Sequence, residues 1–213
     1  MPKRAAARTH AKNPHRPKGP PAAKRTRASA ARQPNLLITI DERHRDLARK
    51  EVAALLARIG AKDYRFAQID EGLLGVNLPV DDAKACVARL QRLVREDPLA
   101  FQHTHRWIPI EAWLKADEAA LRRFGNDAQD AIGPTETWKI DVHRHRSALD
   151  RDLMIQSLAG GIDNPHIDLD EADKTVALEI IGDKAAVSVL ARDQQLSVDR
   201  VLRSEFVRFE EVS

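Results

Sequence analysis

The chain has 213 residues, of which 43% are hydrophobic and 31% are charged, and its formal net charge is +3. This composition indicates a soluble protein of one or two globular domains, and no apolar run approaches the ~18 residues that a membrane-spanning helix needs. The N-terminus has no apolar secretory segment and there is only one cysteine, so we expect a cytoplasmic protein with no internal disulfide and no cysteine zinc cluster.

Charge is distributed unevenly along the chain. Residues 1–34 contain ten lysines or arginines and no acidic residue, whereas residues 35–213 contain 25 basic and 32 acidic residues, a net charge of −7. A proline-rich segment of this kind buries too little apolar surface to offset its ordering entropy, so we predict a disordered basic tail over 1–34. The tail is either a flexible arm for a polyanion, with Lys24, Arg25 and Arg27 among its contacts, or a solubilising extension.

The first half of the remaining chain predicts a small sheet covered by helices on one face. Its expected elements are a strand over Asn35–Ile40, a helix over His44–Ile59, strands over Tyr64–Ile69 and Leu73–Leu78, a helix starting at Asp81 or Asp82, and a strand over about 101–110. Asp41 and Gly60 supply start and stop signals for the first helix. Cys86 shares a predicted helix face with apolar residues, which favours a small buried side chain over a reactive thiol. The element order predicts a ferredoxin-like domain over residues 35–110.

The second half adds another group of helices and strands. We expect helices over Ala112–Phe124 and Asn126–Ile132, a strand over Thr137–Val142, a helix capped by Asp150, a short segment Ile167–Leu169, and strands over Thr175–Ile181 and Ala185–Leu190. Trp138 alternates with Ile140 and Val142, so core packing is expected for this tryptophan rather than stacking on a base. The fold class is therefore α/β (α+β).

The order of motifs after residue 111 resembles the THUMP domain, an RNA-binding module of tRNA-modifying proteins. In that family a strand ends in basic residues, an arginine opens the next helix, and a Val-Asp-Leu step precedes two closing strands. Here Arg144 or Arg146, then Arg151, then Ile167-Asp168-Leu169 stand at those places. The family often continues with Asn-Pro-Asp, whereas this chain reads Asp-Glu-Ala-Asp over 170–173. The resemblance implies a THUMP domain over 111–200 and a C-terminal extension over 201–213.

The strand Leu36–Thr39 and the segment Trp107–Ile110 extend the resemblance to the stand-alone THUMP proteins of tRNA cytidine acetylation. These proteins present tRNA to a separate RNA cytidine acetyltransferase that makes N4-acetylcytidine, and related THUMP domains hold the single-stranded acceptor end. The resemblance implies a tRNA-binding adaptor that is not an enzyme, because residues 191–213 are too few for a catalytic domain. A general RNA-binding or regulatory module, and a catalyst whose motif escapes notice, are the alternatives.

Four cationic side chains of the second half are candidate RNA contacts: Lys139, Arg144, Arg146 and Arg151. Arginine suits RNA because its planar fork binds phosphate bidentately and stacks on bases. Arg151 opposes the helix dipole in a first helical turn at a cost of ~0.3–1 kcal/mol, which a bound anion would offset. The alternative for Arg151 is an ion pair with Asp150 or Asp152.

Other constellations favour neither a metal nor a cofactor. The pairs His103/His105 and His143/His145 have the spacing of residues on one exposed sheet face, which is more common than a zinc site. The acidic run 168–173 lacks the ligand order and the central glycine of a calcium loop. There is no dinucleotide-binding glycine motif, Walker motif or Gly-x-Ser-x-Gly elbow. Trp107 and Trp113 flank the junction between the halves, where they either form the interdomain contact or receive a partner enzyme.

Overall fold

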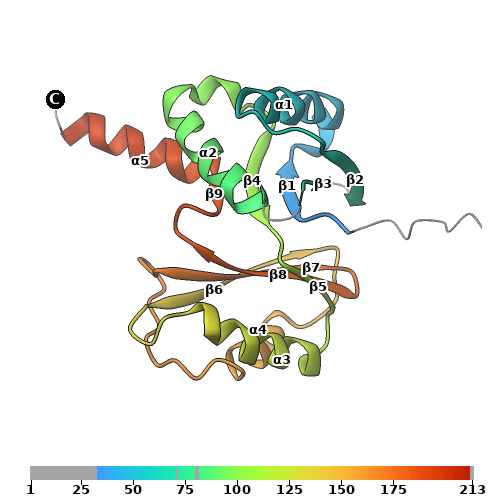
Figure 1. The fold of residues 1–213 in the computed structure, drawn as a ribbon, viewed down its shortest axis with the longest axis vertical. Coiled ribbons are helices and arrows are strands. Elements are labelled where there is room, and N and C mark those ends of the chain that lie inside the picture. The colour runs from blue at the N-terminus through green and yellow to red at the C-terminus, as the bar shows by residue number, and fades with distance from the viewer. Residues whose placement is uncertain (1–32, 71, 80–81, 212–213) are drawn as a thin grey trace, which may run out of the picture. The chain divides into compact units, whose positions relative to one another are not determined.

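The computed structural model describes residues 33–70, 72–79 and 82–211, and the predicted disordered tail, with Lys24, Arg25 and Arg27, lies outside them. Residues Arg32–Ser213 form one compact unit. It contains a five-stranded sheet in the order β2-β3-β1-β4-β9 and a four-stranded sheet in the order β5-β8-β7-β6. Figure 1 shows helices α1 and α2 on the first sheet and α3 and α4 on the second. The α/β fold class is therefore confirmed.

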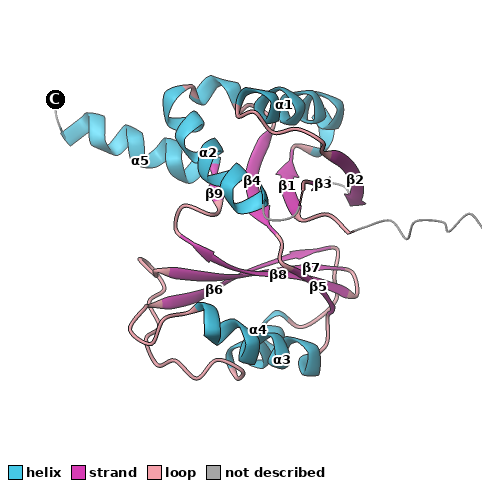
Figure 2. Cartoon of the chain, viewed as in Figure 1, coloured by secondary structure: helices cyan, strands magenta, loops and turns pink. Residues whose placement is uncertain are grey.

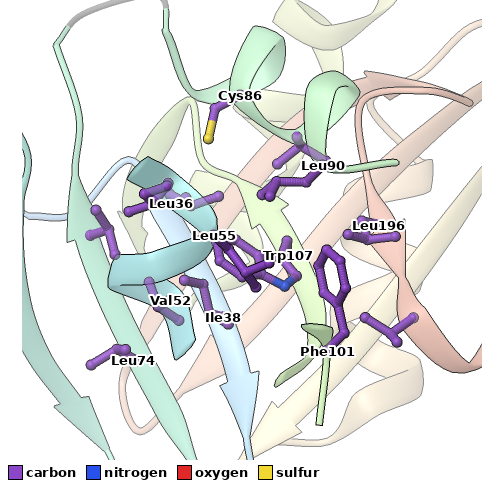
Figure 3. Packing of buried hydrophobic residues seen from close by; sticks show 14 of the residues in the cluster. Leu36, Ile38, Val52, Leu55, Leu74, Cys86, Leu90, Phe101, Trp107 and Leu196 are labelled. Carbon is purple, nitrogen blue, oxygen red and sulfur yellow. The ribbon is translucent and has the colours of Figure 1, made fainter. Parts of the chain in front are cut away.

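The first sheet has the element order β-α-β-β-α-β of a split β-α-β arrangement. Its elements are β1 (Leu36–Ile40), α1 (Arg45–Arg58), β2 (Arg65–Asp70), β3 (Leu73–Asn77), α2 (Asp82–Glu96) and β4 (Thr104–Pro109). All neighbouring strands of this sheet are antiparallel. Figure 3 shows Trp107 of β4 among Ile38, Leu55 and Phe101, in the core that the sheet shares with its helices.

Local signals place the ends of the first helix where the sequence predicts them. The Asp41 carboxylate accepts a hydrogen bond from the backbone N–H of Arg43 at 3.0 Å, and a short 3₁₀ helix, η1 (Glu42–His44), precedes α1. Gly60 follows the helix with a positive φ of 75°, which a residue without a Cβ adopts without strain. Cys86 is buried, and burial raises the pKa of its thiol to about 12, so the prediction of an inert buried cysteine is confirmed.

The second sheet is closed on one face by two helices. Its elements are β5 (Ala112–Lys115), α3 (Glu118–Ala128), β6 (Trp138–His145), α4 (Arg151–Ala159), β7 (Lys174–Ile181) and β8 (Lys184–Ala191). Strand β6 runs parallel to β7, and the other pairs are antiparallel. Figure 2 shows β5 as a strand, at the place where the sequence predicts the start of a helix at residue 112.

The two helices predicted over Ala112–Phe124 and Asn126–Ile132 are wrong in their boundaries. Residues Ala112–Lys115 form strand β5, because they pair with β8, a long-range contact that local periodicity cannot reveal. Helix α3 starts after Asp117, whose carboxylate accepts from the N–H of Ala120 at 2.9 Å, and it continues through Gly125. Residues Gln129–Ala131 then form only a 3₁₀ turn, η3.

Gly125 lies inside α3, and its lack of a side chain lets α3 approach the end of α4 closely. A Cβ at Gly125 would lie 2.3 Å from the carbonyl oxygen of Leu158. We therefore expect Gly125→Ala to lower the free energy of unfolding by ~2–3 kcal/mol, although alanine favours a helix by ~1 kcal/mol over glycine. Chemical denaturation measures this, with the exposed neighbour Asn126→Ala as control. A Gly125→Ala protein as stable as the parent would contradict the close approach.

The chain returns to the first sheet after β8. Strand β9 (Leu196–Ser197) pairs with β4, and α5 (Val198–Glu211) packs against α2. Val198, Val201 and Leu202 of this helix contribute to the first core. The sequence predicts a C-terminal extension from residue 201, and residues 201–211 of that extension belong to α5. The sequence predicts no element after Leu190. Strand β9, with two residues, has no periodicity of its own, whereas α5 does carry a local signal in the helical spacing of Val198, Val201 and Leu202.

A third apolar cluster joins the faces of the two sheets that carry no helices. Leu37, Ile108 and Ile110 of the first half meet Ala177, Ala186 and Leu190 of the second. Trp113 packs against this cluster and donates its indole N–H to the carbonyl oxygen of Pro34 at 2.8 Å, so its predicted place at the junction is correct. Trp107 is instead fully buried in the first core, so neither the junction nor an exposed docking surface applies to it.

Candidate nucleic-acid interface

Strand β6 forms one edge of the second sheet, and its two faces have different surroundings. Trp138 and Val142 belong to the core beneath α3 and α4, which confirms core packing for Trp138. Lys139, Asp141 and His143 alternate with them and line a pocket on the opposite face. The strand runs to His145, three residues beyond its predicted end, because its pairing with β7 continues to Ile181. The basic residues His143–Arg146 therefore lie at the carboxyl end of an edge strand.

Three candidate arginines lie where β6 ends and α4 begins, and all three are exposed. Arg144 donates from Nη1 to the carbonyl oxygen of Leu149 at 3.0 Å, which holds its side chain against the loop. Arg146 has a positive φ of 48°, and its Nη1 lies 3.8 Å from Oδ1 of Asp70. Arg151 is the first residue of α4. Arg151 follows Arg144 by only seven positions, so the three residues of this arginine cluster (Arg144, Arg146 and Arg151) lie close together along the chain.

The start of α4 is already capped by a carboxylate. Oδ1 of Asp150 accepts from the N–H groups of Leu153 at 3.0 Å and Asp152 at 2.8 Å, and these bonds hold the pKa of Asp150 below its usual value. The same N–H groups are the donors that an anion at the helix start would use. Nη1 of Arg151 lies 3.6 Å from Oδ1 of Asp152, the ion pair considered as the alternative. Both groups are exposed, so an RNA phosphate can replace this weak pair.

Lys139 has a structural contact besides its candidate role. Its Nζ donates hydrogen bonds to the carbonyl oxygens of Leu169 and Asp170, both at 3.1 Å. These bonds hold the loop that contains Ile167-Asp168-Leu169 against β6. Ile167 forms an isolated parallel bridge with Trp138. Asp168 accepts from the N–H groups of Glu171 and Asp170, which lowers its pKa. The acidic run therefore includes a carboxylate that closes a turn.

A partly buried ionic network that the sequence does not reveal lies beneath the end of β6. Glu179 of β7 is fully buried; its Oε2 lies 2.7 Å from Nε2 of His145, and its Oε1 lies 3.1 Å from Nη2 of Arg106. The same Nη2 is 3.2 Å from Oδ2 of Asp141, whose Oδ1 is 2.9 Å from Nε2 of His143. This ionic network (Arg106, Asp141, His143, His145 and Glu179) joins β4 of the first sheet to β6 and β7 of the second.

The network accounts for the second His-x-His pair by hydrogen bonds to carboxylates. Burial opposes ionisation of Asp141, but the hydrogen bond from His143 and the charge of Arg106 outweigh it, and the pKa of Asp141 is lowered. The ring of His103, from the first pair, lies 5.3 Å from the ring of His44. Among the described residues, no three histidine, cysteine or acidic side chains are grouped so as to hold a metal ion.

Comparison with protein families finds the THUMP domain at residues 124–190, from α3 to the end of β8. This range contains the arginine cluster, Lys139 and Glu179. No curated protein matches the chain by sequence. None of the helices in the described part of the chain is long and apolar enough to cross a membrane.

Three solved structures are similar to the chain at low sequence identity. PH1313 from Pyrococcus horikoshii Ot3 is 14% identical with a TM-score of 0.50, over 73% of this chain and 54% of that one. TrmN from Thermus thermophilus is also 14% identical, with a TM-score of 0.47 over 76% of this chain and 45% of that one. A 4-thiouridine synthetase, solved with RNA and ATP, is 9% identical with a TM-score of 0.43, over 78% and 42%.

The chain spans about half the length of the solved structures that it resembles. At 14% identity the likeness to PH1313 concerns the fold alone. The family match and the arrangement of β6, α4, β7 and β8 agree on the same segment, and the motifs that predict the module from sequence lie within it. The chain contains a THUMP domain, which indicates RNA binding in tRNA modification.

Proposed function

We propose that the protein is a tRNA-binding adaptor that presents tRNA to a separate RNA cytidine acetyltransferase for N4-acetylcytidine formation. The observation that carries the RNA-binding part is the exposed arginine cluster inside the matched THUMP segment. The acetylation part rests on the resemblance of Leu36–Thr39 and Trp107–Ile110 to the stand-alone THUMP proteins. The protein performs no chemistry in this proposal and acts by positioning the RNA.

The geometry of the arginine cluster suits a single-stranded end of RNA. Single strands expose phosphates and unstacked bases, and guanidinium groups bind the former and stack on the latter. The three arginines lie on three different backbone elements: Arg144 at a strand end, Arg146 in a turn and Arg151 at a helix start. The folded part is acidic overall, and this local cationic surface is therefore needed for an anionic ligand.

The first experiment compares intact tRNA with the same tRNA trimmed of its single-stranded acceptor end, each titrated with the full chain at several salt concentrations. We expect the trimmed tRNA to bind clearly more weakly. Equal affinity would reduce the interaction to general charge attraction and contradict acceptor-end recognition.

A second experiment separates the adaptor from a general RNA-binding module. The acetyltransferase is assayed on tRNA with and without the protein, and the protein is tested for its own turnover. Stimulation supports the adaptor. Absence of stimulation with intact tRNA binding would favour the RNA-binding or regulatory module, and turnover by the chain alone would make it an enzyme.

Removal of the basic tail should weaken tRNA binding and reduce its salt dependence. Pro34 is buried and its carbonyl oxygen accepts from Trp113, so the deletion should end at residue 32. The deletion removes ten cationic side chains. Because each cation that binds a phosphate releases a counterion, the slope of log Kd against log salt concentration should fall. Titration of the full and shortened chains measures the slopes. An unchanged slope would show that the tail makes no contact with RNA.

A further inference from the structure

A pocket of about 500 Å³ lies on the face of β6 opposite to α4. Its walls come from β4 and α2 of the first half, from β6, β7 and the loop before β7 in the second, and from the returning segment after β8 with β9 and α5. The volume is in the range of sites for small ligands. The pocket exists because the chain crosses back to the first sheet after β8 and closes this side.

The lining is cationic. Five basic side chains contribute to it, namely Arg95, Arg106, Lys139, Arg192 and Arg200, against three carboxylates. Two of those carboxylates are engaged within the protein: Asp141 with Arg106 and His143, and Glu171 with Arg192. Arg200 is exposed on the first turns of α5 and has no ion-pair or hydrogen-bond partner among the described residues. Arg106 and Arg192 are paired with carboxylates, so the positive charge that remains for an anionic ligand is that of Lys139 and Arg200, which have no ion-pair partner among the described residues.

Arg106 gives the pocket a fixed guanidinium with unused donor capacity. Its Nη2 is held by Asp141 and Glu179, whereas its Nη1 is buried without a hydrogen-bond partner among the described residues. A buried donor without an acceptor is unfavourable, and because Nη1 has almost no accessible surface, a ligand oxygen can satisfy it only after a small shift of the surrounding side chains. Because the other nitrogen is anchored, little side-chain entropy is lost when such an oxygen binds.

The remaining lining is mixed. Ile108, Leu196 and Val201 supply apolar surface, and Thr175, Ser197 and Gln195 supply hydroxyl and amide groups. A flat apolar ring, a hydroxyl-bearing sugar and a phosphate together match this combination better than a simple inorganic anion does.

The position of the pocket relates it to the arginine cluster. His143 lines the pocket and Arg144 is the next residue, with its side chain on the other face of the same strand. Since β6 is the outer strand of its sheet, no further strand separates the two faces. A nucleic-acid strand that passes around this edge can contact the arginine cluster on one side and the pocket on the other.

We infer that the pocket holds one nucleotide of the RNA that the arginine cluster binds, with its phosphate directed to Arg200 and Arg106. This inference rests on the proposed RNA-binding function and adds a second contact region, formed jointly by both sheets and α5. The C-terminal segment then has a binding role besides its packing role.

The test uses Arg200→Ala and Arg200→Glu in the full chain, with Arg203→Ala and Arg203→Glu as matched controls. Arg203 is exposed on the same helix, three residues away, and does not line the pocket. Neither residue belongs to a core, so thermal unfolding should show no change in stability. Binding of intact tRNA is measured by fluorescence anisotropy at several salt concentrations, and binding of cytidine 5′-monophosphate by equilibrium dialysis.

We expect Arg200→Ala to weaken tRNA binding about five- to tenfold and to reduce the salt slope by about one, with a larger loss for Arg200→Glu and little change for the Arg203 variants. Equal effects at Arg200 and Arg203 would indicate general charge and overturn the inference. Wild-type tRNA affinity in the Arg200 variants would also overturn the inference, even if these variants lost their binding of the free mononucleotide. A wild-type chain that binds no tRNA would refute the proposed function itself, and this is seen before any variant is made.

Discussion

Substitution of the arginine cluster, Arg144→Ala with Arg146→Ala and Arg151→Ala, is expected to weaken tRNA binding about a hundredfold at moderate salt. Each exposed guanidinium that contacts a phosphate contributes a charge-assisted hydrogen bond and releases a counterion, so the salt slope should fall by about two to three. The side chains are exposed, so the loss should concern binding rather than folding. Titration of labelled tRNA at three or more salt concentrations measures both quantities.

The matched control removes the same charge from outside the THUMP segment. Lys62, Arg65 and Arg92 are exposed, lie in the first half, and do not line the pocket. Their combined alanine substitution should lower affinity only slightly, through the change in net charge. If the control and the arginine cluster lose equal affinity, the THUMP segment is not the principal contact surface.

Glu179→Ala is expected to lower the free energy of unfolding by ~3–5 kcal/mol. The side chain is fully buried between the sheets, and its removal leaves the guanidinium of Arg106 without one of its two counter-charges and His145 without its hydrogen-bond partner. Glu171→Ala is the control, because Glu171 forms an exposed pair with Arg192 that should contribute no more than ~1 kcal/mol. Urea denaturation of both variants measures the difference.

A double substitution tests whether the loss comes from the unpaired charge. Arg106→Leu with Glu179→Leu removes both ions and leaves apolar side chains in their place, so it should be less destabilising than Glu179→Ala alone. If the double variant is the less stable of the two, the network contributes more than charge compensation. Because Arg106 also lines the pocket, the double variant should bind tRNA more weakly even when it is fully folded.

The ionic network has a consequence for the proposed adaptor role. His145 is the last residue of β6, directly between Arg144 and Arg146, and Glu179 fixes its ring. Arg106 ties the same carboxylate to the first sheet. Residues of both halves of the protein therefore hold the strand end that carries the arginines. In the proposed adaptor, the first half would position the RNA-binding arginines.

Features that depend on neighbouring residues were predictable from the sequence. The apolar runs on either side of Gly182-Asp183 predicted β7 and β8, and Asp41, Gly60 and Asp150 marked helix ends through contacts within a few residues. The motif order that identified the THUMP segment is also local. The arginine cluster could be predicted as a group because a strand end, a turn and a helix start follow one another within eight residues.

Only the tertiary structure decided the features that depend on distant partners. Residues 112–115 have the composition of a helix, but pairing with β8 makes them a strand; β9 and α5 acquire their place through β4 and α2. Arg106 and Glu179 are 73 positions apart in the chain, and no spacing rule connects them. By itself, then, the sequence determined the family of the RNA-binding module and its exposed cations, because periodicity, caps and motif order are short-range. The ionic network and the pocket required the stacking of two sheets, since burial and charge pairing across such distances arise only when the chain is folded.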